Sequence, residues 1–274
     1  MVKILNKLFD RILDIFLSKD KTKLYVLSFF VLGFILRLIA VFNLPTSVDA
    51  SGHALMAFNF ISSGKLATWN QSVGLWHFLT DLAYKIFGVG DFGARFAALI
   101  FGSLSIILIF LFTKEFFSKK AGLIAAFLLA VSPFPITETV PEMDVAVMFF
   151  VLLGMLFFVK ALKQNKKLLF ALSGAFVGVG ILIKIYALLF IPALLLYAIY
   201  YAIKYKFERK PFIKRIIIFL FVTFIFILVP LSYNYLLYKD KGFVDYIFTN
   251  TLGIGKDKSD QYYSWVVPYH HEYK

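Results

Sequence analysis

Long runs of apolar residues alternate with short polar segments along most of the chain. A helix crosses the hydrocarbon core of a bilayer with about 20 apolar residues. The pattern predicts seven spans, at 24–43, 95–113, 121–137, 143–160, 168–183, 185–203 and 215–237. We therefore expect an all-α polytopic membrane protein of about seven transmembrane helices.

The first connection on the outer side, about residues 44–94, is long and is not polar throughout. FISSGK and IFGVGD have glycine where a helix would end, and WHFLTDLAYKIFG between them has helical periodicity. We expect two helices lying at the outer interface, with Trp69 and Trp76 near the lipid head groups.

The two ends of the chain differ from the middle. MVKILNKLFDRILDIFLSKDK alternates charged and apolar residues at helical spacing, which predicts a cytoplasmic amphipathic helix over 1–22, with a frayed basic tail as the alternative. Residues 23–238 form the transmembrane module. Residues 239–274 are polar and rich in aromatic residues, and are predicted to be an outer tail or the start of a truncated loop.

Composition strengthens the membrane prediction. The chain is 61% hydrophobic and 16% charged, with 34 phenylalanines, whereas soluble domains are about 45–50% apolar and about 25% charged. There is no cysteine, which excludes disulfides, thiolate metal sites and a cysteine nucleophile.

The formal net charge of +13 does not indicate nucleic-acid binding, because the basic residues sort by membrane side. They cluster before the first span and in every second connection, which places the N-terminus in the cytoplasm and the C-terminal tail outside. We expect a prokaryotic plasma membrane. Most acidic residues fall on the outer side, and a functional site on that face would explain this bias.

PTSVDASGHALMAF, residues 45–58, holds the first candidate site. Asp49 follows a turn and precedes a helix, with His53 one helical turn later. The alternative is a helix N-cap, since aspartate accepts a backbone N–H well. The two roles are compatible, because a capping carboxylate is held rigidly.

PITETVPEMDVAVMFF, residues 135–150, holds the second acidic cluster, Glu138, Glu142 and Asp144. Pro141 suits the first position of a helix, so Glu142 and Asp144 fall in the first turn of the fourth span. Favourable interaction with the helix dipole explains one such acid. Three acids within seven residues are more than that explanation needs.

Basic residues near the outer side are sparse, which makes Lys184 and Arg95 informative, and a third basic residue lies within a span. Lys184 interrupts GVGILIKIYALLF, and could either extend to the interface or hold a lipid phosphate. Arg95 could pair with Asp91 four residues earlier or bind a phosphate. Arg37 lies inside the first span and needs a partner or a cavity.

The four histidines also fall on the outer side, and His77 is spaced as a helical pair with Asp81. No spacing makes a convincing metal site, so no cofactor is predicted. A divalent ion remains possible if the fold brings the two acidic groups together.

The order of these features resembles that of the GT-C glycosyltransferases. It is most similar to the protein O-mannosyltransferase-like family, of the dolichyl-phosphate-mannose-protein mannosyltransferase type, which includes the bacterial aminoarabinose transferase. The resemblance covers about residues 24–200 and is strongest over 86–134, from FGVGDFGARFAALIFGSLS to AAFLLAVSPF. An acid in the first outer loop, an acid opening the fourth span, and LIKIYALL complete it.

The resemblance implies a GT-C-like bundle that transfers a sugar from a polyprenyl phosphate to a glycan, lipid or protein acceptor on the outer face. The family's first-loop acid, its base or an essential carboxylate, matches Asp49, and its second acid matches Asp144. Its Thr-Lys-Gly-like segment matches Ile183-Lys184-Ile185. The reaction needs a base for the acceptor hydroxyl and positive charge for the departing phosphate.

These requirements assign roles to the candidate residues. Asp49 would be the base or would orient the acceptor, and Asp144 would support it or bind sugar hydroxyls. Lys184 and Arg95 would hold the phosphate, and His53 and Glu142 would also contact substrate. A hydrophobic groove would hold the lipid chain, and displacement from the side opposite the phosphate would invert the anomeric carbon.

The chain departs from the family pattern in three places. Ala50 stands where members often have a second acid, Ser72-Val73-Gly74-Leu75 replaces a Lys-Pro-Pro-Leu segment, and members are usually longer. An inactive or accessory fragment of a longer enzyme therefore stays open. A transporter is disfavoured, because the ionisable residues, Arg37 excepted, lie mainly at span ends.

Overall fold

The computed structural model describes residues 20–45, 48–63, 74–137, 142–241 and 244. All regular structure within these ranges is helical, which confirms the all-α prediction. The predicted amphipathic helix over 1–22 and the tail over 239–274 lie almost entirely outside the described residues, so both stay predictions.

The first group of helices contains α2 (Thr22–Asn43), α5 (Asp91–Phe116) and α6 (Lys119–Val131), which pack against one another. Sequence chemistry sets the ends of α6. The Ser118 side chain accepts a hydrogen bond from the Ala121 N–H at its start. At its end Ser132 precedes Pro133, and a residue before proline disfavours the helical conformation. The chain then turns into the short α7 (Pro133–Thr137).

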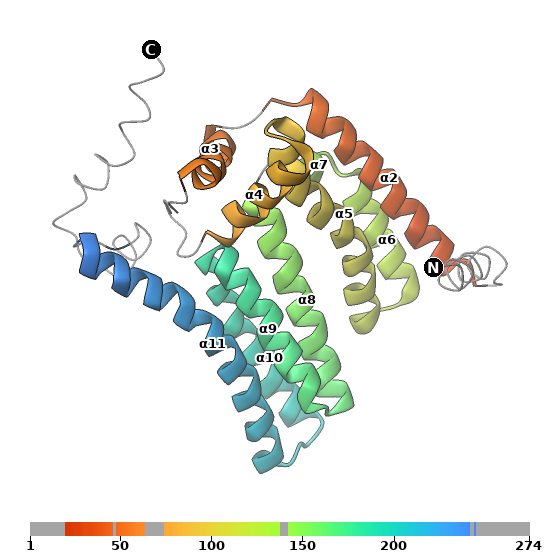
Figure 1. The fold of residues 1–274 in the computed structure, drawn as a ribbon. Coiled ribbons are helices and arrows are strands. Elements are labelled where there is room, and N and C mark those ends of the chain that lie inside the picture. Colours follow the sequence, from red (N-terminus) through yellow and green to blue (C-terminus); the bar gives the residue numbers. More distant parts are fainter. Residues whose placement is uncertain (1–19, 46–47, 64–73, 138–141, 242–243, 245–274) are drawn as a thin grey trace, which may run out of the picture.

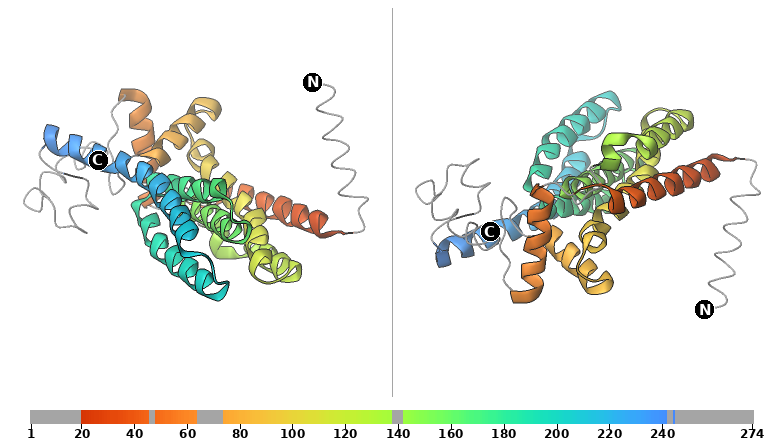
Figure 2. Two further views of the ribbon diagram at one scale, coloured as in Figure 1. Left: turned by 90° about the horizontal axis from the view of Figure 1, so that it is seen from below. Right: turned by 90° about the horizontal axis from the view of Figure 1, so that it is seen from above.

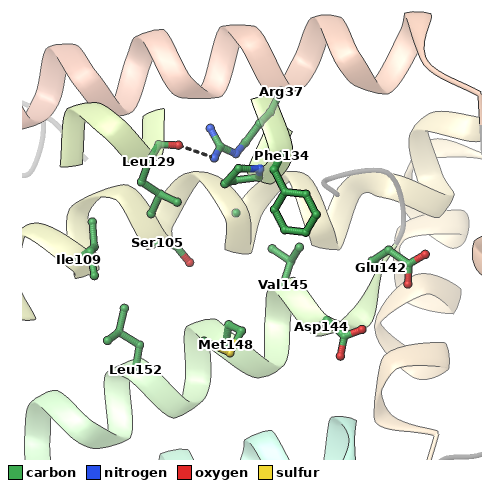
Figure 3. A pocket seen from close by; sticks show the side chains of 12 residues that line it. Arg37, Ser105, Ile109, Leu129, Phe134, Glu142, Asp144, Val145, Met148 and Leu152 are labelled. Atoms are coloured by element: carbon green, nitrogen blue, oxygen red, sulfur yellow. Dashed lines mark hydrogen bonds between the residues drawn. The ribbon is translucent and has the colours of Figure 1, made fainter. Parts of the chain in front are cut away.

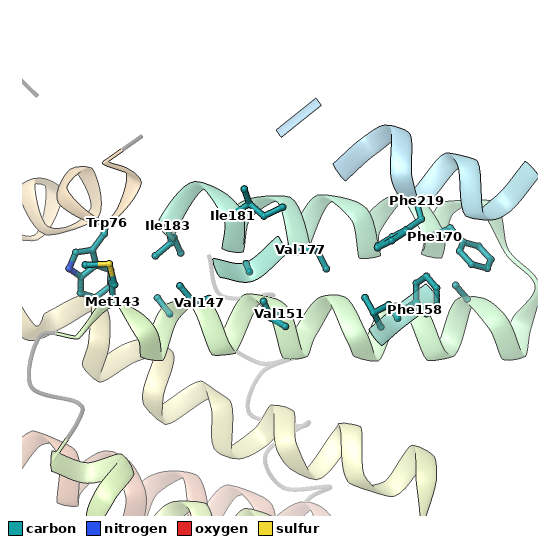
Figure 4. Packing of buried hydrophobic residues seen from close by; sticks show 14 of the residues in the cluster. Trp76, Met143, Val147, Val151, Phe158, Phe170, Val177, Ile181, Ile183 and Phe219 are labelled. Atoms are coloured by element: carbon teal, nitrogen blue, oxygen red, sulfur yellow. The ribbon is translucent and has the colours of Figure 1, made fainter. Parts of the chain in front are cut away.

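The second group contains α8 (Met143–Gln164), α9 (Lys167–Ile183), the 3₁₀ helix η1 (Ile185–Leu189), α10 (Phe190–Lys204) and α11 (Arg209–Lys241). Helix α9 packs against both α8 and α11. The main hydrophobic core lies here: the ring of Phe158 is 5.7 Å from that of Phe170 and 5.0 Å from that of Phe219, between centroids (Figure 4). Helices α2 and α11 lie on opposite sides of the molecule (Figures 1 and 2).

Two further helices, α3 (Val48–Ser63) and α4 (Leu75–Phe87), lie at one end of the bundle, where α5 and α8 begin and where α2 and α9 end (Figure 1). This confirms the prediction of two helices in the first long connection. Trp76, however, is buried beside Met143 and Ile183 in the core (Figure 4). We call this end of the bundle the α3–α4 end.

Five of the seven predicted spans are helices long and apolar enough to cross a membrane in the described part of the chain: Thr22–Asn43, Asp91–Phe116, Met143–Gln164, Ile185–Lys204 and Arg209–Leu236. The other two are shorter. Helix α9 has 17 residues, and the span predicted over 121–137 is divided between α6 and α7 at the Ser132–Pro133 step.

Small residues allow α9 to approach its neighbours closely. A Cβ added at Gly174 would lie 2.6 Å from the carbonyl oxygen of Phe219, and one added at Gly154 would lie 2.6 Å from Val177. The hydroxyl of Ser173 donates to the Gly154 carbonyl at 2.8 Å, which ties α9 to α8. Close backbone approach is the usual basis of helix association in lipid, where apolar contact alone gives little advantage over lipid tails.

Replacing Gly174 with alanine should therefore destabilise the bundle, because the new methyl group meets backbone that cannot rotate away. Overpacking of this kind costs about 1–3 kcal/mol. Thermal stability in detergent, measured as the fraction still monodisperse on size exclusion after heating, should fall clearly. Gly180→Ala on the same helix is the control, since its Cβ meets Val151 only at 3.3 Å. Equal losses in the two variants would contradict the packing argument.

Candidate active site

The structure brings together two of the predicted site residues, Asp144 and Lys184, from positions 40 residues apart. Lys184 Nζ lies 2.8 Å from Asp144 Oδ1 and 3.0 Å from Oδ2. The Lys184 side chain is 21% exposed and that of Asp144 is 58% exposed. An ion pair this accessible contributes about 0–1 kcal/mol, so the contact is one that a ligand can replace.

Local backbone structure positions both side chains. Glu142 is extended at the start of α8, which places Asp144 in the first helical turn, where the helix dipole favours a carboxylate. Lys184 is extended between α9 and η1, with φ −152° and ψ 125°. The break that the sequence indicated at this lysine is thus real, and it directs the side chain across to α8. Lys184 Nζ also lies 5.8 Å from the centre of the Tyr186 ring.

A cavity of about 470 Å³ adjoins this pair (Figure 3). Its walls come from α2, α5, α6, α7 and α8, and we call it the Arg37 cavity. Most of its lining is apolar, including Ile109, Leu129, Phe134 and Leu152. Its polar and charged residues are Arg37, Ser105, Glu142 and Asp144. Glu142 and Asp144 lie at one end of the cavity, and Ile109 and Leu152 lie at the other (Figure 3).

Arg37 is the buried cation of this cavity, with 1% of its surface exposed. Its Nη2 donates to the Leu129 carbonyl at 3.0 Å, and its Nη1 donates to the Gly33 carbonyl at 3.1 Å and the Ala130 carbonyl at 3.4 Å. Its Nε has no hydrogen-bond partner among the described residues. The arginine therefore has both a set of partners and a cavity.

Arg95 occupies a different place. Its side chain is 2% exposed, and its Nη1 donates to the Val41 carbonyl, which links α5 to the last turn of α2. It forms no ion pair with Asp91 within the described residues, and it does not line the Arg37 cavity. In this arrangement Arg95 connects two helices. Its predicted contact with phosphate stays a prediction.

The remaining acidic candidates are placed less completely. Helix α3 begins at Val48, so Asp49 lies in its first turn, but its side chain falls outside the described residues. Glu138 also falls outside them. Glu142 lines the Arg37 cavity. In the described part of the chain no three histidine, aspartate or glutamate side chains converge as metal ligands would, and a divalent ion involving Asp49 stays untested.

His53 and His77 join the two helices of the α3–α4 end. His53 Nδ1 and His77 Nε2 are 3.2 Å apart, and the residues are 4% and 1% exposed. Asp81, one turn after His77, is equally buried and accepts from Lys85 Nζ at 2.9 Å. Burial, and then the neighbouring His53, lower the pKa of His77 from 6.5 to about 3, so this imidazole is neutral at physiological pH.

Three features of the site were not recognised from the sequence. The first is the contact between Asp144 and Lys184, which depends on how α8 and α9 pack. The second is Ser105 in the cavity wall, where the spacing of Gly102 and Ser105 on α5 was the available signal. The third is that Arg37 binds backbone carbonyls in the last turn of α6. These carbonyls need a partner because α6 ends at Val131, earlier than the predicted span.

With this geometry in view, comparison with known proteins defines the fold. Two structures of the oligosaccharyltransferase from Archaeoglobus fulgidus are similar to this chain. The apo form matches with a TM-score of 0.65 and 19% identity, covering 78% of this chain and 30% of that one. The form in complex with an inhibitory peptide and a dolichol-phosphate matches with a TM-score of 0.61 and 18% identity, covering 77% and 30%.

A family model gives the family. The model described as dolichyl-phosphate-mannose-protein mannosyltransferase matches residues 75–233, more than half of the chain, and the chain belongs to this family. The resemblance to GT-C glycosyltransferases is thereby confirmed for family and fold. None of the curated proteins matches the chain. The chain spans about a third of the length of the solved structures that it resembles.

The contact between His53 and His77 predicts a pH dependence of stability. The pKa of His77 is lower in the folded chain than in the unfolded chain, so protonation of this histidine favours unfolding. Its contribution to the free energy of unfolding is therefore complete above about pH 6.5 and is lost as the pH falls toward 3. Between pH 6.5 and 5.0 the loss is at most about 2 kcal/mol. Thermal unfolding in detergent should therefore shift more between pH 7.5 and 5.0 in the native chain than in His77→Gln. A shift of the same size in both would contradict it.

Proposed function

We propose that this chain carries the donor-side machinery of a membrane glycosyltransferase, which moves a sugar from a polyprenyl phosphate to an acceptor hydroxyl at the outer face. The observation that carries the proposal is the Asp144–Lys184 pair beside the Arg37 cavity. Family membership supports it. So does the fold shared with an oligosaccharyltransferase whose structure holds a dolichol-phosphate and an inhibitory peptide.

The reaction sets out what each residue must do. The acceptor oxygen forms a bond to the anomeric carbon, and the bond from that carbon to the phosphate oxygen breaks. The polyprenyl phosphate leaves with the bonding electrons, and the acceptor proton passes to a carboxylate. Attack opposite the leaving phosphate inverts the anomeric carbon. Because phosphate is already a good leaving group, a base and a cation are the main requirements.

Lys184 is the cation that the geometry favours for the phosphate. Its ammonium group is partly accessible, and its present partner, the carboxylate of Asp144, stands where an anionic oxygen of a ligand would stand. When a phosphate takes this position, Asp144 is released to accept hydrogen bonds from sugar hydroxyls. Arg95, with a buried guanidinium bound to α2, is the weaker candidate.

Asp49 is the proposed base, in the first turn of α3 at the end of the bundle where α8 begins. His53 lies one turn further along α3 and packs against His77 of α4. We propose that this contact fixes the orientation of α3, so that His53 acts by positioning rather than by touching the reacting atoms.

Replacing Lys184 with alanine should reduce co-purified polyprenyl phosphate at least tenfold, because the phosphate loses its charged partner. Native mass spectrometry of the full chain in mild detergent measures the bound lipid directly. Lys85→Ala is the matched control, since Lys85 also pairs with an aspartate, at 2.9 Å, in the same part of the molecule. Equal loss in both variants, or no polyprenyl phosphate in the native chain, would sink the assignment.

Replacing Asp49 with asparagine should abolish sugar transfer while leaving lipid binding intact, because the amide cannot accept the hydroxyl proton. Asp144→Asn should lower transfer about 10²–10³-fold, the usual effect of removing one group that stabilises a transition state. The assay follows release of polyprenyl phosphate by the reconstituted chain from a panel of polyprenyl-phosphate sugars. Unchanged transfer in Asp49→Asn removes this residue from the mechanism, and transfer by no variant, the native chain included, favours an accessory fragment.

A further inference from the structure

The Arg37 cavity has a polar end and an apolar end, and the two ends select different parts of a ligand. Glu142 and Asp144 lie at the end nearest the α3–α4 helices, and Ile109 and Leu152 lie at the opposite end (Figure 3). The volume, about 470 Å³, is within the usual range for a small-molecule site.

The apolar end lies among helices that can span a membrane. Residues 144, 148 and 152 of α8 line the cavity at four-residue spacing, which is one face of that helix. On the other side α2 and α5 contribute Arg37, Gly102 and Ile109. The apolar end of this space therefore suits a hydrocarbon chain, whereas an extended peptide would leave its backbone groups without hydrogen bonds there.

The polar end disfavours a phosphate. Two carboxylates, Glu142 and Asp144, are in its wall, whereas Lys184, which pairs with Asp144 from outside, is not among the lining residues. A phosphate inside the cavity would therefore meet carboxylates and not the Lys184 ammonium group, and like charges at short range repel. Carboxylates are good acceptors for hydroxyl donors. Both terminal nitrogens of Arg37 donate to backbone carbonyls. Its buried Nε lies next to Gly102, 3.3 Å from the position that a Cβ on this glycine would take. The end is thus suited to a neutral group with free hydroxyls.

We propose that the Arg37 cavity binds a neutral amphipathic lipid with a free hydroxyl in its head group, and that this lipid is the sugar acceptor. The second half of the proposal rests on the function proposed above. The lipid's hydroxyl oxygen bonds to the anomeric carbon, polyprenyl phosphate departs with the electron pair of the broken bond, and the hydroxyl proton passes to a carboxylate.

A separate groove leaves room for the chain of the donor. It measures about 450 Å³ and lies between α10 and α11, where Ile191, Leu220 and Phe224 contribute to an almost entirely apolar lining. Helix α10 follows Lys184 directly through η1, whereas α8 and α9 separate this groove from the Arg37 cavity. Two lipids could therefore occupy the two spaces and present their head groups near the Asp144–Lys184 pair.

Photo-crosslinking of the full chain in nanodiscs tests the site. Three probes carry a diazirine in the chain: a dialkylglycerol, the same lipid with its hydroxyl methylated, and a polyprenyl phosphate. We expect the dialkylglycerol to label peptides of α5 and α8 at least fivefold more than the methyl ether does. Met148→Trp, which fills the cavity wall, should reduce this labelling at least fivefold. Leu220→Trp, in the α10–α11 groove, should change it less than twofold.

Other outcomes overturn the site as proposed. Stronger labelling of α5 and α8 by the polyprenyl phosphate would make the cavity a donor site. Equal labelling by the glycerol and its ether would mean ordinary bilayer contact, and absent labelling would mean no lipid site. If Met148→Trp does not assemble, Leu152→Trp fills the apolar end instead. In the double variant Glu142→Ala, Asp144→Ala, which removes both side-chain acceptors, the preference for the free hydroxyl should disappear.

The acceptor role is tested separately, by supplying a polyprenyl-phosphate sugar together with the dialkylglycerol and analysing lipids by mass spectrometry. A glycosylated dialkylglycerol supports the role. Transfer to an added peptide and not to the lipid overturns it while leaving the glycosyltransferase function intact. Hydroxyl-dependent labelling without any transfer keeps the lipid site and refutes the proposed enzymatic function for this chain.

Discussion

The last carbonyl groups of a helix have no hydrogen-bond partner within it, and the need to satisfy them where they are buried organises one half of the molecule. Helix α6 has 13 residues, about 20 Å at the usual rise, which is less than the hydrocarbon thickness of about 30 Å. Arg37 of α2 binds the carbonyls of Leu129 and Ala130 near its end. The space beyond α6 is then free for α7 and for the Arg37 cavity, so the cavity depends on the early end of this helix.

The other half is built on close contact between backbones. Gly154 and Gly174 let α8, α9 and α11 approach, and the rings of Phe158, Phe170 and Phe219 fill the space beside them. This packing fixes the height of Lys184 relative to Asp144, because each lies at the end of a helix in the group. Small residues in the middle of the bundle therefore determine the geometry of charged residues at its end.

Hydropathy predicted the helical class and most span positions, because every span must satisfy its backbone hydrogen bonds internally. It placed one span over 121–137 where the structure has α6 and α7, since an apolar count does not register the effect of Pro133 on Ser132. The break at Lys184 was predicted correctly, because a charged residue interrupts the apolar run there.

The sequence identified single residues of the candidate site, but it did not predict which of them would be in contact. Asp144 and Lys184 stood out singly, as ionisable groups at span ends, but their contact spans 40 residues and follows from tertiary packing alone. The sequence offered Arg95 as a phosphate ligand on the same grounds as Lys184. In the structure its side chain is buried and donates to the Val41 carbonyl. Trp76 shows the same limit, since an aromatic residue next to a membrane surface can also be a core residue.

The ion pair at the end of α8 also bears on how selective such a site can be. Asp144 and Lys184 belong to the same folded chain, so their contact is intramolecular. The Asp144 carboxylate therefore binds the Lys184 ammonium group at a high effective concentration. A free inorganic anion has to compete with this internal carboxylate from dilute solution. If the pair is the phosphate site proposed above, an anion carried on a lipid meets this competition better than a soluble one, because it is itself concentrated in the membrane. With a pair worth about 0–1 kcal/mol, that competition lowers the affinity for a soluble anion by about fivefold at most.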